Sequence, residues 1–249
     1  MDQRKLQPQQ KEYISSVDGK KDVYFVREAG KGKDCIVFLH GHGGHGDQIF
    51  THSKLETVRN FLAEKTVNII SPELRGNAWM NPAAVSDLAE ILLREKENLQ
   101  FRKCIFASAS MGGTGALIFG MCHPEMLDAL IVLGGVSDLR RYREWCAAGD
   151  LAIHREIAAA ITAGYTEDDL TLHSVWAHPE RLTMPLRFYH SVADRVMPVS
   201  EMRYLREKMK DSADAGFVEV PALEVAPDWW SDHDAPVAYF AEALCEFLA

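Results

Sequence analysis

The sequence predicts an α/β protein with a mostly parallel central sheet and helices on both faces. Three observations predict it: short apolar runs of strand length recur, amphipathic stretches of helix length separate them, and no internal repeat interrupts the alternation. Strands that alternate with helices imply parallel pairing through right-handed crossovers. A chain of 249 residues is long enough for one large domain of this kind.

The chain opens with a predicted antiparallel hairpin, because "KEYISSV" and "KDVYFVREA" flank the turn-forming "DGKK". Continuous β-branched and aromatic runs then predict buried strands. These strands are "DCIVFLH", "TVNIISPEL", "KCIFASAS", "LDALIVLGG", "PLRFYHSVAD" and "GFVEVPALEVA". The predicted helices are residues 48–64, "NPAAVSDLAEILLREKENL" with Pro82 near its start, "MGGTGALIFGMCH", "VSEMRYLREKMKD" and "APVAYFAEALCEFLA".

The rhythm of the chain changes at about 138–182. This stretch is helical or irregular in pattern and contains no predicted strand. Such an insertion fits over the carboxyl ends of the strands, where α/β sheets place their sites. We therefore expect a single domain over residues 1–249 with a small lid insertion at about 138–182.

Composition excludes several classes of function. The net charge is −9, with 36 acidic against 27 basic residues, so no basic surface is expected for nucleic acid or for anionic membranes. The sequence contains no run of about 18 apolar residues and no apolar segment near its start that resembles a signal peptide. Five cysteines, an odd number without C-x-x-C spacing, indicate buried thiols in a reducing cytoplasm. No cofactor is predicted.

The strongest chemical signal is "FASASMGGTGAL". Ser110 lies between a predicted strand and a predicted helix, with Gly112 and Gly113 directly after it. A sharp strand-to-helix turn of this kind lifts a serine hydroxyl above the sheet, and small neighbours let the strand and the helix approach. The usual pattern is G-x-S-x-G, and Ser108 stands at its first glycine. A glycine-rich turn with a capping serine is the alternative interpretation.

A second signal is "IVFLHGHGGHGD", in which His40, His42 and His45 follow a strand. Their spacing resembles the first half of the metal motif of metallo-β-lactamases, H-x-H-x-D-H, which would make the chain a metal-dependent hydrolase. Gly44 replaces the metal-binding aspartate, and no matching downstream ligands are found. The same letters also suit a glycine-rich loop that offers backbone N–H groups to an oxyanion.

Four segments together resemble the α/β-hydrolase fold, in its esterase and prolyl-oligopeptidase-like branches. These are "HGHGG" after a strand, "SASMGG" on a strand–helix turn, "HSVADRVMPV" after a later strand, and "SDHD" before the last helix. The resemblance runs from about residue 20 to the end, in the order Ser, Asp, His. It implies a serine hydrolase that cleaves carboxylic esters through an acyl-enzyme.

The resemblance also implies a role for each site residue. Ser110 is the expected nucleophile, and His233, in a polar loop before the last helix, is the expected base. Asp194 matches the acid loop and is expected to orient His233, whereas Asp138, one strand earlier, is the runner-up. The backbone N–H groups of two further residues are expected to bind the oxyanion. These are His42 and Met111.

The substrate is expected to be a small-molecule ester. Gly43, Trp79 and Trp229 are the expected substrate-binding residues: Gly43 through a backbone N–H beside that of His42, and the two tryptophans because aromatic walls suit apolar ligands. Core packing explains the tryptophans equally well. A small peptide or amide substrate, and a non-catalytic binding module of the same fold, stay open as alternatives, and the sequence does not indicate an oligomeric state.

Overall fold

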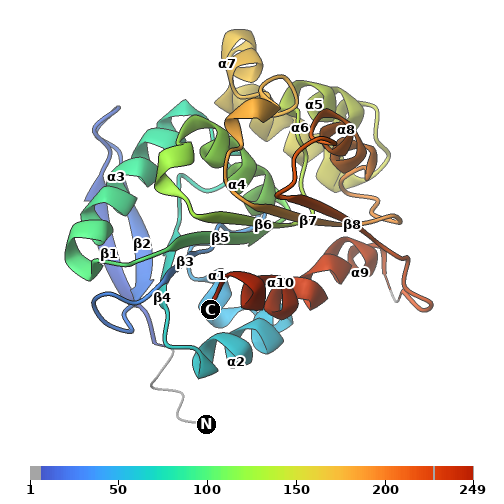
Figure 1. Ribbon diagram of the computed structural model, residues 1–249. Helices are drawn as coiled ribbons and strands as arrows, with labels where there is room; N and C mark the ends of the chain where they lie inside the picture. Colours follow the sequence, from blue (N-terminus) through green and yellow to red (C-terminus); the bar gives the residue numbers. More distant parts are fainter. Residues whose placement is uncertain (1–6, 227, 249) are drawn as a thin grey trace.

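The computed structural model describes residues 7–226 and 228–248, with the side chain of Trp229 outside the described part (Figure 1). Within it, eight strands form one sheet in the order β1-β2-β4-β3-β5-β6-β7-β8. The strands are β1 (Gln9–Ile14), β2 (Lys21–Arg27), β3 (Cys35–Val37), β4 (Asn68–Pro72), β5 (Cys104–Ala109), β6 (Ala129–Leu133), β7 (Leu186–Ser191) and β8 (Ala215–Val220).

Pairing direction divides the sheet into two parts. β1 pairs with β2, and β2 with β4, in antiparallel register, as the hairpin prediction requires. The pairs from β4 to β8 are parallel. The predicted α/β class with a mostly parallel sheet is therefore confirmed.

Helices cover both faces of the sheet (Figure 1). α3 (Pro82–Leu99), α4 (Met111–Cys122) and α8 (Ser200–Lys208) lie on one face. The other face carries α1 (Gln48–Thr51), α2 (Glu56–Glu64), α9 (Trp229–Asp234) and α10 (Phe240–Phe247). Residues 138–182 form α5 (Leu139–Ala147), α6 (Ala152–Gly164) and α7 (Glu167–Leu172), without a strand. Short 3-10 turns complete the chain at η2 (Ser53–Leu55), η3 (Pro124–Met126), η4 (Pro179–Arg181) and η5 (Ala235–Tyr239).

Two hydrophobic cores follow from the alternation of side chains along the strands. Val37 and Phe106 pack towards Leu117 of α4, whereas Ile36 packs on the opposite face towards Leu244 of α10. Successive residues of a strand point to opposite faces, so a continuous apolar run fills both cores. This is why β3 (CIV) and β6 (ALIVL) are apolar without interruption.

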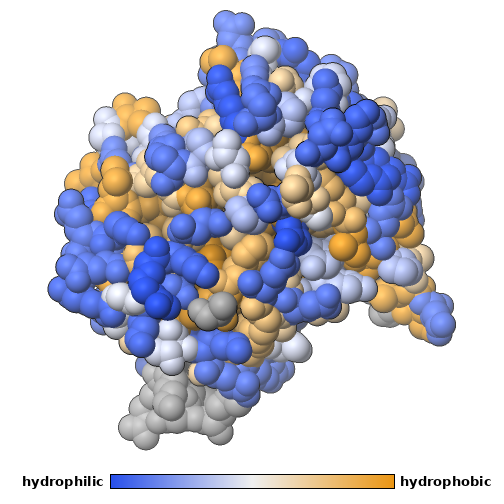
Figure 2. Space-filling model, viewed as in Figure 1, coloured by the Kyte–Doolittle hydropathy of each residue, from blue (hydrophilic) through white to orange (hydrophobic). Residues whose placement is uncertain are grey.

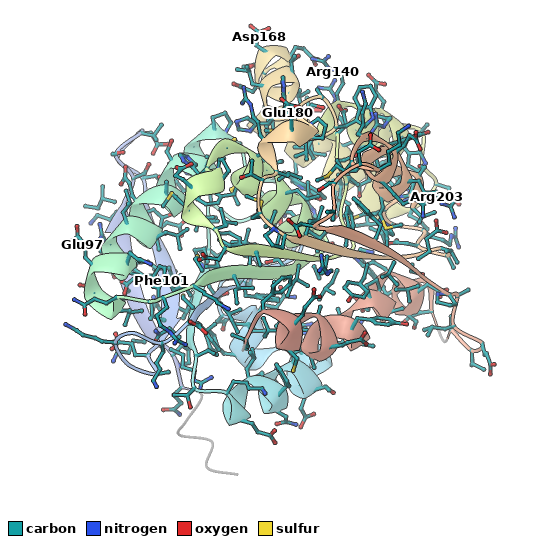
Figure 3. The ribbon with its side chains drawn as sticks, viewed as in Figure 1. Glu97, Phe101, Arg140, Asp168, Glu180 and Arg203 are labelled. Atoms are coloured by element: carbon teal, nitrogen blue, oxygen red, sulfur yellow. The ribbon has the colours of Figure 1, made fainter. Side chains whose placement is uncertain are left out.

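Many charged side chains lie at the periphery, although some, such as Glu95 and Glu201, are buried. Glu97, Arg140, Asp168, Glu180 and Arg203 point outward from the elements that carry them (Figure 3). Hydrophilic residues cover much of the upper right of the same view, where α5 to α8 lie, and the centre is mixed (Figure 2). In the described part of the chain, no helix combines the length and the apolar character needed to cross a bilayer.

Two predicted elements differ from the structure. The helix expected over 48–64 is broken at His52, whose extended backbone and side chain cap the turn η2. The loop expected around His233 is instead the short helix α9, capped by Asp228. Both η2 and α9 begin at a residue whose side chain accepts a backbone N–H, His52 for η2 and Asp228 for α9. Such a local hydrogen bond favours the start of a new turn over continuation of the preceding segment.

Candidate active site

Ser110 occupies the sharp turn between β5 and α4, with a φ of 58°. That region of backbone space is strained for any residue with a side chain. The glycines that follow allow the turn, because a Cβ on Gly112 would lie 2.0 Å from the Leu39 carbonyl oxygen, and one on Gly113 would lie 2.3 Å from that of Gly134. Close contact of α4 with neighbouring loops therefore fixes the position of Ser110.

Ser108, which departs from the usual glycine, has a structural role here. Its side chain is fully buried, and its Oγ accepts a hydrogen bond of 2.9 Å from the backbone N–H of Leu39. Leu39 leads directly into the histidine-rich loop. The extra hydroxyl thus ties the serine strand to that loop, which a glycine could not do.

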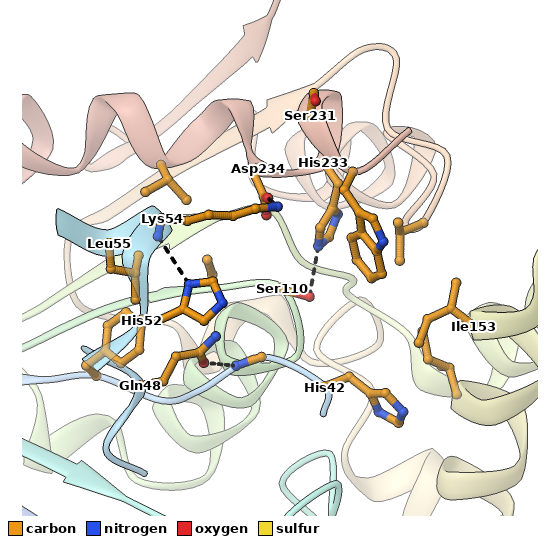
Figure 4. Close-up of a pocket in the computed structure, with 17 residues that line it drawn as sticks. His42, Gln48, His52, Lys54, Leu55, Ser110, Ile153, Ser231, His233 and Asp234 are labelled. Carbon is orange, nitrogen blue, oxygen red and sulfur yellow. Dashed lines mark hydrogen bonds and ion pairs between the residues drawn. The ribbon is translucent and has the colours of Figure 1, made fainter. Parts of the chain in front are cut away.

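Three side chains from distant parts of the chain meet at this turn. His233 Nε2 lies 3.0 Å from Ser110 Oγ (Figure 4). His233 Nδ1 lies 2.8 Å from Asp194 Oδ2. Both His233 and Asp194 are buried. The structure therefore joins Ser110, His233 and Asp194, as expected from sequence, in one hydrogen-bonded chain.

The hydrogen bonds around Asp194 keep it ionised. Its Oδ1 accepts backbone N–H groups from Val196, at 2.7 Å, and Met197, at 2.9 Å. Burial opposes ionisation, but the charge of His233 and the hydrogen bonds from His190 and His233 outweigh it and hold the pKa of Asp194 well below its usual range. A charged acid is therefore present beside the imidazole at neutral pH.

The interaction with Asp194 also changes the pKa of His233, which it raises. Burial lowers the pKa of His233, whereas the charge of Asp194 and its hydrogen bond raise it, and the net result is a pKa above the usual 6.5. Because Asp194 accepts from Nδ1, the neutral ring carries its proton there. Nε2, which faces Ser110, is then free to accept a proton.

The loop after β3 places backbone N–H groups beside Ser110. Gly41 lies next to it, since a Cβ on Gly41 would be 3.8 Å from Ser110 Cβ. The Gly41 N–H donates to Gln48 Oε1 at 3.0 Å, and the Gly43 N–H donates to Asn77 Oδ1 at 2.7 Å. Two side chains thus clamp the loop on either side of His42.

Two backbone N–H groups beside Ser110, those of His42 and Met111, have no acceptor within the described residues. Within the described residues, neither the His42 N–H nor the Met111 N–H donates a hydrogen bond, and Met111 also begins α4. The N–H of Gly43, expected to assist in binding, is instead occupied by Asn77. The geometry therefore leaves the N–H groups of the two expected donors, His42 and Met111, without an acceptor among the described residues, whereas the N–H of Gly43 already has one.

Trp79, expected in the substrate pocket, lies behind it. Its side chain is 1% exposed, and its Nε1–H donates to His42 Nδ1 at 3.2 Å. Burial lowers the pKa of His42, so the neutral ring accepts this bond. The tryptophan holds the His42 side chain from below and does not line the cavity. The sequence could not distinguish these two placements, because an aromatic residue on a loop near the site looks the same whether it lines the pocket or packs behind it.

Asp138, the runner-up acid, caps a helix. Its side chain accepts the Arg141 N–H at 2.8 Å at the start of α5, and the hydroxyl of Ser174 also donates to it. Within the described part, it is Asp194 that contacts His233. The structure thus brings together the preferred pair.

Above Ser110 lies a pocket of about 520 Å³ (Figure 4). One wall comes from β3 and the α1–η2 segment, and the other from α6, α9 and the loop of Asp194. The first wall contains Phe38, Gln48, His52, Lys54 and Leu55, and the second contains Ile153, Ile157, Val196 and Trp230. Ser110 and His233 lie between the two walls.

Comparison with solved structures shows which fold this is. The fluorophosphonate-binding serine hydrolase F of Staphylococcus aureus, solved with substrate bound, superposes with a TM-score of 0.72 at 14% identity, covering 97% of this chain and 98% of that one. An esterase of Pyrococcus furiosus gives 0.70 at 14% identity, with 100% and 95% covered. A thermostable esterase gives 0.62 at 17% identity, with 97% and 62% covered. This chain has the α/β-hydrolase fold.

Sequence comparison gives a weaker likeness. Epoxide hydrolase 4 of Mus musculus is 25% identical over 131 residues, which are 49% of this chain and 33% of that protein. The Homo sapiens protein of the same name is 24% identical over the same shares. The chain thus spans about a third of the length of these curated relatives. No protein-family model matches the sequence.

The three histidines of the loop after β3, His40, His42 and His45, contact different partners. The two ring nitrogens of His40 lie 2.8 and 2.9 Å from backbone carbonyl oxygens of Gly41 and Glu73. His42 accepts from Trp79, and His45 lies 3.2 Å from a Glu73 carboxylate oxygen. Among the described residues, no cluster of three or more His, Cys, Asp or Glu side chains is arranged to hold a metal ion.

Several residues of this site were not predicted from the sequence. Gln48 and Asn77 clamp the loop after β3, and His190 Nε2 approaches Asp194 Oδ2 at 3.5 Å. Ile153 and Ile157 reach the pocket from α6. Asn77 lies 34 residues from its partner, and no local pattern signals such a contact. The "HSVAD" spacing that pointed to Asp194 could also have indicated His190.

Trp229 was expected to line the pocket, but its side chain lies outside the described residues. Its neighbour Trp230 lines the pocket, with its ring 5.5 Å from that of His233 in an edge-on arrangement.

Proposed function

We propose that this chain is a serine hydrolase that cleaves carboxylic esters through an acyl-enzyme intermediate, without a metal or a cofactor. One observation carries the proposal. The Ser110 hydroxyl, the His233 imidazole and the Asp194 carboxylate are linked by contacts of 3.0 and 2.8 Å, at the edge of a pocket. Nucleophile, base and orienting acid are the groups that acyl transfer requires.

In the first half of the proposed reaction, Ser110 Oγ attacks the ester carbonyl carbon while His233 Nε2 takes its proton. The carbonyl oxygen becomes an oxyanion, which the N–H groups of His42 and Met111 stabilise. Asp194 stabilises the imidazolium that forms. The intermediate then expels the alcohol, which takes the proton from His233, and the acyl group stays on Ser110.

The second half repeats these steps with water. His233 removes a proton from water, which attacks the acyl carbon of the Ser110 ester, and the same two N–H groups hold the new oxyanion. Expulsion of Ser110 Oγ, with return of the proton from His233, releases the carboxylic acid and restores the free enzyme. Each proton therefore moves through His233 Nε2.

The name of the curated relatives suggests epoxide opening as a second reaction, and the chemistry of Ser110 argues against it. Attack of a serine oxygen on an epoxide carbon would form an alkyl ether. An ether has no carbonyl carbon for water to attack, so the enzyme would be blocked after one turnover. A nucleophile that opens epoxides repeatedly has to form an ester, as a carboxylate does.

We further propose that residues 138–182 act as a lid within one domain spanning residues 1–249. Ile153 and Ile157 of α6 support this, since both line the pocket from that insertion. A lid of this kind excludes water and shapes the acyl pocket. The cytoplasmic location stays a prediction from the cysteines.

The test of the proposed function is covalent labelling. Incubation with a fluorophosphonate should add one phosphonyl group at Ser110, identified by peptide mass mapping. The labelled protein should lose activity on a panel of aryl and alkyl esters, whereas matched anilides should be cleaved more slowly. Absence of label on protein that hydrolyses esters, or a label at another residue, would contradict the mechanism. Cleavage of anilides as fast as esters would favour the amide alternative.

A further inference from the structure

The two walls of the pocket differ in chemistry. The wall formed by α6 and the Asp194 loop presents apolar side chains, of which Ile157 and Val196 are 1% and 2% exposed. α9 adds Trp230 to this wall, together with the polar residues Ser231 and Asp234. The opposite wall contains Phe38 and Leu55, and it also presents the polar ends of Gln48, His52 and Lys54. An ester has two arms on either side of its carbonyl carbon, so each wall meets one arm when the carbon lies at Ser110.

Hydrogen bonds within the protein fix which polar atoms face the pocket. His52 Nδ1 accepts the backbone N–H of Lys54 at 3.3 Å, so the neutral ring carries its proton on Nε2. Figure 4 shows this second nitrogen pointing towards the centre of the pocket, where Ser110 lies. Gln48 Oε1 accepts from Gly41, which leaves the Gln48 amide nitrogen as a donor. Neither donor has an acceptor among the described residues.

The charge on this wall is balanced. Lys54 Nζ contacts a carboxylate oxygen of Asp234, so its ammonium group is already paired. An anionic ligand would have to approach the Asp234 carboxylate, and a cationic ligand would meet Lys54. A neutral group that both accepts from His52 and Gln48 and donates to Asp234 fits best, and hydroxyl groups do both.

The exposed side of the pocket also suits the leaving group. The Lys54 side chain is 56% exposed and His52 is exposed, whereas Ile157 and Val196 of the apolar wall are buried. The alcohol has to depart before water attacks the acyl-enzyme, but the acyl group stays bound until the second step. The open, polar side is therefore the place for the alcohol arm.

We propose that the preferred substrate is an ester of a neutral polyhydroxylic alcohol with an apolar acyl group, and that His52 Nε2–H and the Gln48 amide bind the hydroxyls of the alcohol arm. This inference rests on the proposed function, because it assumes that Ser110 attacks the ester. It adds the chemical class of the alcohol and names His52 as a specificity-determining residue.

The experiment compares kcat/KM for four butyrate esters that differ in the alcohol. These are the glyceryl, ethyl, carboxymethyl and choline esters. We expect the glyceryl ester to be the best of the four, and the ratio of glyceryl to ethyl ester to fall by about threefold to tenfold in His52→Asn, the range for loss of one uncharged hydrogen bond. Asparagine is itself a good capping acceptor for the Lys54 N–H, so the segment keeps its turn.

His45→Asn serves as the matched control, because its side chain is 75% exposed and pairs with Glu73 outside the pocket. The glyceryl-to-ethyl ratio should not change in this variant. Ethyl 3-hydroxybutyrate, which carries its hydroxyl on the acyl arm, tests the orientation and should gain nothing over ethyl butyrate.

Fluorophosphonate labelling of Ser110 in the same samples separates the two proposals. If Ser110 is labelled but the glyceryl ester has no advantage, or if His52→Asn leaves the ratio unchanged, the inference is wrong and the proposed function stands. Preference for the carboxymethyl or choline ester, or an advantage of the acyl-side hydroxyl, also overturns it. If Ser110 is not labelled and no ester is cleaved, the proposed function itself fails.

Discussion

Ser110 and His233 meet at 3.0 Å, but the segments that carry them are built differently. Ser110 is held by backbone packing: Gly112 and Gly113 press α4 against neighbouring loops with no room for a Cβ. His233 lies on the six-residue helix α9, and its ring is held in place by the Asp194 side chain. The position of Ser110 thus depends on close contact between main chains, whereas the position of the His233 ring depends on side-chain hydrogen bonds.

This difference determines how the site can be broken. A defect on the Ser110 side either removes the nucleophile or disturbs the fold, because the turn is part of the core. A defect on the His233 side can misorient the ring while the fold survives. Substitutions on each side should therefore separate activity from stability.

The largest effect on activity is expected from Ser110→Ala. Loss of the nucleophilic oxygen should lower kcat by about 10⁴-fold or more. The fold should persist, since alanine removes only a hydroxyl from a residue whose turn is fixed by its neighbours. Steady-state kinetics and thermal unfolding of the purified variant measure both quantities. Retention of more than a hundredth of the activity would contradict Ser110 as the nucleophile.

Asp194→Asn should lower turnover by about 10³–10⁴-fold. Asn Oδ1 would keep the N–H bonds from Val196 and Met197, so its amide nitrogen would face His233 Nδ1. That contact favours the tautomer with the proton on Nε2, which can no longer accept from Ser110.

The matched control for this variant is Asp138→Asn. Asparagine caps a helix as well as aspartate does, so this change should lower turnover by less than about tenfold. Circular dichroism on both variants checks that they are folded. A reversed ranking of the two variants would mean that the acid belongs one strand earlier.

Gly112→Ala should act on stability, because its new Cβ would lie 2.0 Å from the Leu39 carbonyl oxygen. Relief requires movement of main chain, and we expect a loss of about 3 kcal/mol or more in the free energy of unfolding. Asp228→Ala, which removes the cap of α9 on the exposed surface, should shift Tm much less. Thermal and urea unfolding of the two variants give the comparison directly. Equal shifts would mean that the two segments are not built differently.

The pH dependence of kcat/KM tests the role of His233 without any substitution. Only neutral His233 can accept a proton from Ser110, so kcat/KM should fall about tenfold per unit as pH drops below its pKa. Because Asp194 raises that pKa, the fall should begin above 6.5 rather than below it. A profile that stays flat to pH 5, with chemistry as the slow step, would remove His233 from its role.

The contrast between local backbone packing at Ser110 and long-range side-chain contacts at His233 also explains which parts of the site the sequence could predict. The Ser110 turn was predictable, since small residues around a serine between a strand and a helix determine it locally. The joining of Asp194 to His233 was expected from a resemblance, carried by the loop "HSVADRVMPV" and by the order of the two residues along the chain. The clamps at Gln48 and Asn77 and the burial of Trp79 depend on partners that folding brings together. Local patterns carry no information about such contacts.

The smallest effect is expected where the sequence offered its most prominent alternative, the metal site at the loop histidines. A metal ligand needs a free ring nitrogen directed at a common point. In this loop His40 contacts two carbonyl oxygens, His42 accepts from Trp79, and His45 extends to Glu73 with 75% of its side chain exposed. To bind one ion, His40 would have to break at least one of its contacts, and the three rings would have to turn towards a common point. We therefore expect His45→Ala to keep most of the esterase activity, and incubation with EDTA or 1,10-phenanthroline to leave it unchanged. Stoichiometric zinc by elemental analysis, together with activity that is lost on chelation and restored by zinc, would show instead that the loop rearranges around a metal.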